Sequence, residues 1–218
     1  MRRTFVAFVV CWIACLLTTP AWAVRPDKNW KSWFGHLAGG YNSPTNDVEG
    51  ILKDGWNFNG GATYWPEHWN VGLALEFGYN FFDIEDSVLD QIEGSNTGDV
   101  EILSATADFI WGPDTTDTPV GVYLTGGIGG YYVDAELGRP GVWEGIICDP
   151  WLWWCYPGLV PGTVITASGS TTRFGWNVGA ALTFKVGLGS QLFIEAKYHR
   201  VDTDTPTEYI PLVIGYRW

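Results

Sequence analysis

The chain has 218 residues and a formal net charge of -12, so it is long enough for one domain and too acidic to favour nucleic acid as a partner. Its mean hydropathy is +0.02, and it contains 14 Trp, 10 Tyr and 11 Phe beside 28 Gly. This density of aromatic residues is unusual for a soluble enzyme. It is typical of a membrane β-barrel, which carries aromatic residues at both membrane interfaces.

The first 23 residues have the pattern of a secretory leader. Arg2 and Arg3 precede an apolar run over 5–17, and Ala21-Trp22-Ala23 fits the small-x-small pattern of a signal peptidase site. The apolar run is too short for a membrane-spanning helix. We therefore expect a cleaved signal peptide at 1–23 and a mature domain over 24–218.

The four cysteines divide between the leader and the mature chain. Cys11 and Cys15 belong to the leader; lipidation of Cys15 is the less favoured alternative, because Trp12 is a poor residue three positions before a lipidated cysteine. The mature chain keeps Cys148 and Cys155, and a local disulfide is their expected state in an exported protein. Two thiolates without nearby histidines make an incomplete zinc site, so metal binding is the weaker alternative.

Eight segments of the mature chain alternate between apolar and polar or small residues with a period of two. In the clearest of them Leu73, Leu75 and Phe77 alternate with Ala74 and Glu76. The eight predicted strands cover approximately 33–42, 56–65, 70–81, 100–111, 120–134, 173–185, 192–199 and 208–218. Since no later uninterrupted apolar stretch is long enough for a spanning helix, a membrane-spanning structure here must be a closed barrel.

The last predicted strand, EYIPLVIGYRW, has one wholly apolar face. Ile210, Leu212, Ile214, Tyr216 and Trp218 share that face. The strand resembles the final strand of bacterial outer-membrane β-barrels, and the resemblance implies that Tyr216 and Trp218 form the insertion signal.

The whole pattern resembles the small outer-membrane β-barrel proteins, the group that includes the barrel of outer-membrane protein A. The most specific part besides the last strand is NVGAALTFKVGLGSQLFIEAKYHRV. The predicted fold is all-β, an eight-stranded antiparallel up-and-down transmembrane β-barrel; a soluble sandwich would alternate similarly, and the leader and the terminal aromatic residue favour the barrel. The resemblance implies the bacterial outer membrane, contact with its lipid and lipopolysaccharide, assembly by the barrel-assembly machinery, and no cofactor.

The connections between predicted strands alternate in length. The short ones lie near 66–69, 112–119 and 187–190, and the longer ones near 43–55, 83–99, 136–172 and 202–207. In barrels of this kind the short turns are periplasmic and the long loops extracellular. We therefore expect both termini on the periplasmic side.

Charged residues on the predicted inward faces are expected to fill the barrel. Eight strands enclose an interior just wide enough for side chains, so these charges favour a salt-bridged plug. The alternative is a narrow pore for small solutes. The predicted interior charges are Glu76, Asp108, Arg173, Lys185, Glu195, Lys197, His199 and Arg217, with His36 on the same side of the wall.

An enzymatic role for His199 is a further alternative. A lipid-modifying barrel enzyme needs a serine nucleophile beside a histidine and a carboxylate. Glu195 shares a strand face with His199, but no serine in a recognisable motif accompanies them. A structural histidine and a non-enzymatic protein are the favoured interpretation.

The connection over 136–172 is the candidate functional surface. It is dense in apolar residues around the two cysteines, and such patches mark contacts with protein or membrane. We expect the protein to have a structural role in the cell envelope or a surface-binding, adhesion-like role through this connection. The alternative for the connection is a loop that folds down and caps the barrel. The candidate binding residues are Trp143, Trp151, Trp153, Trp154 and Tyr156.

The connection over 83–99 is acidic and raises the possibility of a calcium site. Its carboxylates could supply oxygen ligands, but no EF-hand spacing is present. A solvated acidic loop without metal is the favoured interpretation. The residues concerned are Asp83, Glu85, Asp86, Asp90 and Glu93, followed by Asp99 and Glu101.

Overall fold

The computed structural model describes residues 32–66, 69–92, 96–112, 119–149, 154–186, 190–203 and 205–218. For part of the segment between 140 and 162 only the backbone is described. The predicted signal peptide over 1–23 lies outside the described residues, so its cleavage stays a prediction. In the described part of the chain, no helix is long and apolar enough to cross a membrane.

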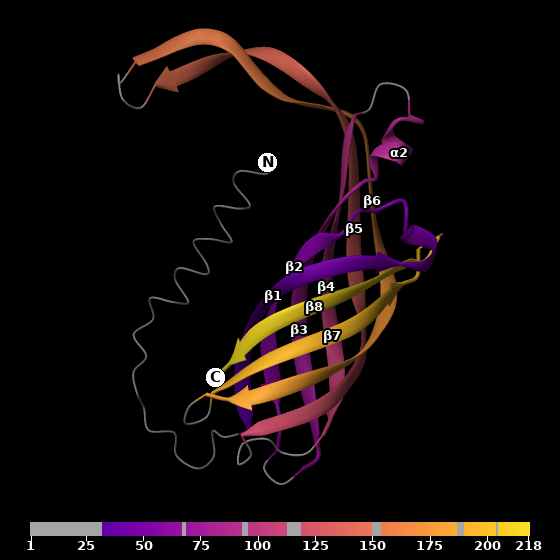
Figure 1. Ribbon diagram of the computed structural model, residues 1–218, viewed down its shortest axis with the longest axis vertical. Coiled ribbons are helices and arrows are strands. Elements are labelled where there is room, and N and C mark those ends of the chain that lie inside the picture. The colour runs from indigo at the N-terminus through magenta and orange to yellow at the C-terminus, as the bar shows by residue number, and fades with distance from the viewer. Residues whose placement is uncertain are drawn as a thin grey trace. The chain divides into compact units, whose positions relative to one another are not determined.

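Eight antiparallel strands close into a barrel in chain order, which confirms the predicted fold class. The strands are β1 (Trp33–Thr45), β2 (Gly55–Tyr64), β3 (Val71–Asp83), β4 (Thr97–Trp111), β5 (Val120–Asp149), β6 (Trp154–Lys185), β7 (Gln191–Val201) and β8 (Thr207–Arg217). Figure 1 shows them as a tilted wall. The first and last strands close it, with His36 opposite Arg217 and Thr45 opposite Glu208.

The wall has an apolar outer surface and a polar interior. On β8 burial alternates from Tyr209 onward: Leu212, Ile214 and Tyr216 are exposed, whereas Val213 and Arg217 are buried. Exposed apolar residues and buried polar ones are the reverse of a soluble sandwich and match a lipid-facing barrel. The predicted faces of the strands are therefore confirmed.

Aromatic residues lie on the outer surface near both ends of the barrel. We call the end that holds the β8 terminus the inner end and the opposite one the outer end. Exposed aromatic residues near the inner end are Trp33, Tyr64, Trp69, Trp111, Tyr216 and Trp218, and those toward the outer end are Tyr41, Trp56, Phe58, Tyr132 and Trp176. Two such belts are expected where a barrel wall meets the two membrane interfaces.

The long connections at the outer end pack into a hydrophobic cap. The β1–β2 connection contains a 3-10 turn, η2 (Asn46–Val48), and the β3–β4 connection contains a short helix, α2 (Asp86–Leu89). Lys53 donates a hydrogen bond to Asp86 at 2.8 Å, which raises the pKa of the Lys53 ammonium and ties the two connections together. The cap and the top of the interior share one buried cluster, made of Val48, Leu52, Phe82, Ile84, Leu89, Val100, Ile102, Tyr131, Val201 and Tyr209.

The fifth and sixth strands are much longer than the sequence predicts. The predicted loop over 136–172 is wrong for most of its length, because Gly138 to Asp149 pairs with Trp154 to Ile165. β5 has 30 residues and β6 has 32. Glycine, proline and consecutive apolar residues obscure the alternation there. A two-stranded ribbon tolerates them, because each strand has an outer edge that needs no partner.

Candidate functional site

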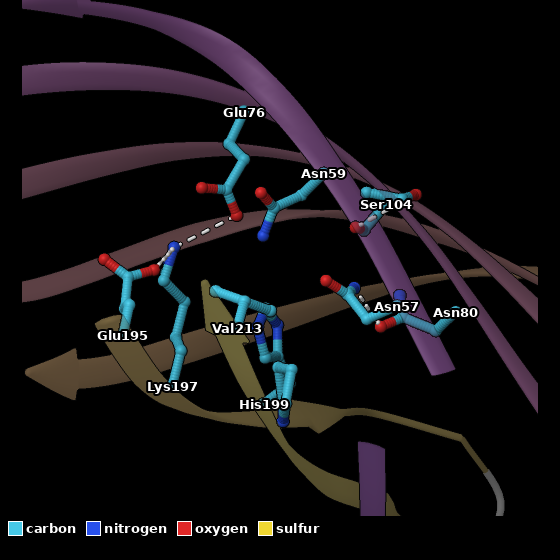
Figure 2. A pocket seen from close by; sticks show the side chains of 11 residues that line it. Asn57, Asn59, Glu76, Asn80, Ser104, Glu195, Lys197, His199 and Val213 are labelled. Carbon is cyan, nitrogen blue, oxygen red and sulfur yellow. Dashed lines mark hydrogen bonds and ion pairs between the residues drawn. The ribbon is translucent and has the colours of Figure 1, made fainter. Parts of the chain in front are cut away.

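A lysine surrounded by three carboxylates occupies the middle of the barrel. The Lys197 ammonium lies 3.0 Å from Glu76, 3.1 Å from Asp108 and 3.1 Å from Glu195, and its side chain is 4% exposed. Asn177 donates a further hydrogen bond to Asp108 at 2.8 Å. Figure 2 shows Glu195 and Lys197 side by side, with Glu76 reaching the same ammonium from across the interior. Charges so deeply buried are stable only when they are paired in this way.

The ion cluster continues toward the inner end through a tyrosine and an arginine. Tyr123 donates a hydrogen bond to Glu195 at 2.7 Å, and Arg217 donates one to the Tyr123 oxygen at 3.0 Å. The Arg217 guanidinium also lies 5.1 Å from the centre of the Tyr123 ring and 5.4 Å from that of Phe193. These contacts link the inner end of the lumen to Lys197 without a break.

Toward the outer end the ion cluster is followed by a layer of rings. The Tyr131 hydroxyl lies 2.9 Å from Nδ1 of His199, and the His199 ring stacks on Tyr209 with centroids 4.9 Å apart and planes 2° apart. Tyr131 and Tyr209 belong to the buried cluster of the hydrophobic cap. His199 is 5% exposed and inside the barrel, away from the lipid-facing surface where a lipid-modifying catalytic group would have to lie.

The open space beside the ion cluster is small. A cavity beside the ion cluster has a volume of about 10 Å³, which is the room for a single water molecule. Its lining includes Glu76, Lys197 and His199, and Figure 2 shows Asn57 and Asn59 on the other side of the space. The described interior is thus packed as a plug, with ions at the middle and rings above and below.

Most of the predicted interior charges meet in this plug, but two do not. Glu76, Asp108, Glu195, Lys197, His199 and Arg217 line the interior, as their strand parity predicts. Arg173 and Lys185 are exposed, so their assignment to the buried set is corrected. Pairing between β6 and β7 runs from Gly175 opposite Val201 to Lys185 opposite Gln191. Arg173 therefore lies beyond the outer rim of the closed wall, and Lys185 lies at the inner rim.

An amide cluster above the ions escaped the sequence prediction. Asn80 accepts hydrogen bonds from Asn42 at 3.0 Å and from Asn57 at 2.7 Å, and it donates one to the Ile102 carbonyl at 3.2 Å. All three asparagines are almost fully buried. Their inward parity follows from the alternation of their strands, but an uncharged amide carries no signal that marks it as part of a cluster.

The paired outer parts of β5 and β6 form a two-stranded ribbon, which we define as Gly138–Asp149 with Trp154–Ile165. Figure 1 shows it continuing beyond the ends of the other strands. Pairing between β4 and β5 stops at Thr97 opposite Gly138, and a register shift at Leu137 and Gly138 marks the base of the ribbon. Thr166 donates a hydrogen bond to the Leu137 carbonyl at 3.2 Å beside this shift. Beyond Gly138, no third strand pairs with the ribbon among the described residues.

The ribbon places the two cysteines opposite each other. Cys148 pairs with Cys155 in the β5–β6 ladder, and Cys155 is disulfide-bonded. Directly opposed positions of an antiparallel ladder are close enough for a cross-strand disulfide. The Cys148 side chain lies outside the described ones, so its identity as the partner stays a prediction.

Three of the predicted binding residues belong to the strands of the ribbon. Trp143 belongs to β5, and Trp154 and Tyr156 belong to β6, although their side chains lie outside the described ones. Trp151 and Trp153 lie outside the described residues altogether. Their role as a contact surface stays a prediction.

The described acidic residues of the connection over 83–99 lie in the barrel wall and in the hydrophobic cap. Asp83 ends β3, and Asp99 and Glu101 belong to β4. Within the described ranges, no group of three or more histidine, cysteine, aspartate or glutamate side chains is arranged to hold a metal ion. Glu93 lies outside those ranges.

Comparison with known proteins agrees with this architecture. The model of the outer membrane protein beta-barrel domain family matches residues 10–215. Among solved structures, Neisserial surface protein A is similar with a TM-score of 0.54 and 15% identity, over 85% of this chain and 96% of that one. A major outer membrane protein from Thermus thermophilus has a TM-score of 0.51 and 12% identity, over 85% and 98% of the two chains.

The attachment invasion locus protein Ail of Yersinia pestis, solved in complex with the heparin analogue sucrose octasulfate, has a TM-score of 0.47 and 19% identity, over 86% of this chain and 99% of that one. No curated protein matches the sequence. At these identities the structural matches show the fold, and the family match covers almost the whole chain. The chain belongs to the outer membrane protein beta-barrel domain family and is a small outer-membrane β-barrel.

Proposed function

We propose that this protein is a surface-binding, adhesion-like protein of the outer membrane whose ribbon makes the contact. The observation that carries the proposal is the ribbon itself, which extends from Gly138 to Asp149 and back from Trp154 to Ile165. Beyond Gly138 it pairs with no third strand among the described residues. Twelve residues of strand span about 40 Å. Long loops are extracellular in this class of barrel, so the ribbon would project away from the cell.

The barrel interior supports a scaffold role better than a channel role. Lys197 and its three carboxylates close the middle of the lumen, and the hydrophobic cap closes the outer end. A pore would need a continuous polar path, and the cavity beside Lys197 has room for only about one water molecule. With the lumen filled, the outer end is left as the part that can act on the surroundings.

The sequence between the two cysteines supports protein or apolar surfaces as the target of the ribbon. Trp151, Trp153 and Trp154 lie together between the two cysteines, and tryptophan is among the residues most enriched at the centre of binding interfaces. Ile146, on the described part of the ribbon, is 73% exposed. The polyanionic ligand of the Yersinia pestis relative is not carried over, because this chain has a net charge of -12.

Replacement of Trp151, Trp153 and Trp154 together by serine tests this proposal. A non-adherent bacterium expressing either form is allowed to settle on bare and protein-coated polystyrene, and retained cells are counted after washing. We expect at least about a tenfold loss of retention, because three such anchors contribute well over the roughly 1.4 kcal/mol that corresponds to tenfold binding.

The matched control replaces three lipid-facing residues, Leu73, Leu75 and Phe77, by alanine, which keeps an apolar wall and leaves the ribbon intact. The amount of folded barrel in the outer membrane is measured for every form. Equal retention of the serine variant and the unchanged protein, or no retention of the unchanged protein on any of these surfaces, would overturn the proposal.

A further inference from the structure

The ribbon has two outer edges, and they differ in chemistry. We propose that the outer edge of β5, from Gly141 to Asp149, accepts an extended cationic segment of a partner protein as an added strand. This inference rests on the proposed surface-binding function and names its partner chemistry. An added strand gains main-chain hydrogen bonds from an uncovered edge and specificity from neighbouring side chains.

The prolines reveal which backbone amides of the ribbon point outward. In an antiparallel ladder, two kinds of residue pair alternate along the strands. In one kind the two residues form backbone hydrogen bonds with each other, and in the other kind both residues direct their backbone amides to the outer edges. Proline has no amide to donate, so it fits the outward-pointing pairs. The three proline pairs are Pro140 with Thr163, Val142 with Pro161, and Ile146 with Pro157. These pairs are separated by even numbers of residues, so one assignment satisfies all of them.

This assignment gives the outer edge of β5 an unbroken series of backbone amide donors and interrupts the series on the outer edge of β6. The outward amides of β5 beyond Pro140 belong to Val142, Glu144, Ile146 and Cys148, an unbroken series. On the β6 edge facing the other way, Pro157 and Pro161 occupy two positions of the same series, so every second donor is missing there. Proline on an edge strand is a known barrier to strand addition. The tip of the ribbon can therefore accept a strand on the β5 side only.

The charges of the two strands point to a cationic partner. Between Gly141 and Asp149, β5 carries Glu144 and Asp149 and no basic residue, whereas β6 carries no acidic residue along its whole length. A second copy of this chain would bring the same acidic edge against itself, so a basic segment is the complementary occupant.

The experiment uses a synthetic ten-residue peptide of alternating lysine and valine and the full-length protein in lipid nanodiscs. Three peptides are compared by isothermal titration: the lysine-valine peptide, the same peptide with alternate amides N-methylated, and a glutamate-valine peptide. We expect the first to bind and each of the others to bind at least about tenfold more weakly, because one lacks the donors of an added strand and the other the charge.

Two proline variants identify which edge of the ribbon binds the peptide. Ile146→Pro removes an outward amide of β5, and Leu159→Pro removes an outward amide of β6 in the same class of pair, so neither breaks a bond within the ribbon. We expect loss of peptide binding for Ile146→Pro and unchanged binding for Leu159→Pro. Infrared or circular dichroism spectra of both variants check that the ribbon and the barrel remain folded.

Several outcomes would overturn the inference: undiminished binding of the N-methylated peptide, equal effects of the two proline variants, or no binding of the lysine-valine peptide. The surface-binding proposal is tested separately by the tryptophan variant. If that variant retains cells like the unchanged protein while Ile146→Pro abolishes peptide binding, the surface-binding proposal fails and the edge assignment stands. If the tryptophan variant loses retention while Ile146→Pro leaves peptide binding unchanged, the ribbon binds surfaces without strand addition and the edge assignment fails.

Discussion

At the scale of single residues, strand parity decides which side chains enter the barrel. Glu76, Asp108 and Glu195 come from three different strands and meet Lys197 because each occupies an inward position at the same height. Parity alone predicts this inward placement. It cannot predict height along the barrel, and this is why the prediction for Arg173, with the same parity but beyond the last β6–β7 pair, is wrong.

Replacement of Lys197 by glutamine should destabilise the barrel strongly. It would leave the three carboxylates without their central cation, and loss of one partner from a buried ion cluster costs about 3–5 kcal/mol. The free energy of unfolding in urea, followed by tryptophan fluorescence in lipid vesicles, measures the effect. The matched control is Lys185→Gln, whose exposed position predicts a change within about 0.5 kcal/mol. A loss under about 1 kcal/mol for Lys197→Gln would contradict the plug.

At the scale of strands, the sequence located all eight and misjudged the length of two. The regular wall strands carry lipid on one face and a polar interior on the other, so a period of two is imposed on them. The ribbon has neither constraint, and its Pro140, Pro157 and Pro161 fall where an edge position tolerates them. Only the pairing of Gly138 to Asp149 with Trp154 to Ile165 in space makes it recognisable as two strands.

Reduction of the disulfide should loosen the ribbon and leave the barrel unchanged. An isolated two-stranded hairpin is only marginally stable in water, so the cross-link at Cys155 is expected to hold the tip together. Hydrogen exchange of amides between Gly141 and Cys148 should accelerate at least about tenfold on reduction, while exchange in β7 and β8 stays the same. A Cys148→Ser and Cys155→Ser double variant, which should exchange rapidly with or without reductant, is the control. Exchange that is indifferent to reductant in the unchanged protein would contradict this role.

At the scale of the whole molecule, the closed barrel and the ribbon have separate tasks. The wall is fixed in lipid by its apolar outer surface, and its interior is filled by the Lys197 cluster, the ring layer at His199 and the hydrophobic cap. The family match over residues 10–215 accounts for the wall and says little about the ribbon's purpose. The packing of these side chains in the middle of the lumen supports the proposal that the outer end makes the functional contact.

The surface-binding proposal is tested most directly by the retention of cells whose protein lacks the ribbon. Residues 139–164 are replaced by a two-residue Asn-Gly turn, which joins the strands at the pair formed by Gly138 and Ile165. Folded barrel in the outer membrane is quantified by its heat-modifiable migration in gels. We expect an unchanged amount of folded barrel with at least about a tenfold loss of retention on polystyrene surfaces. Full retention by cells with the shortened protein would contradict it.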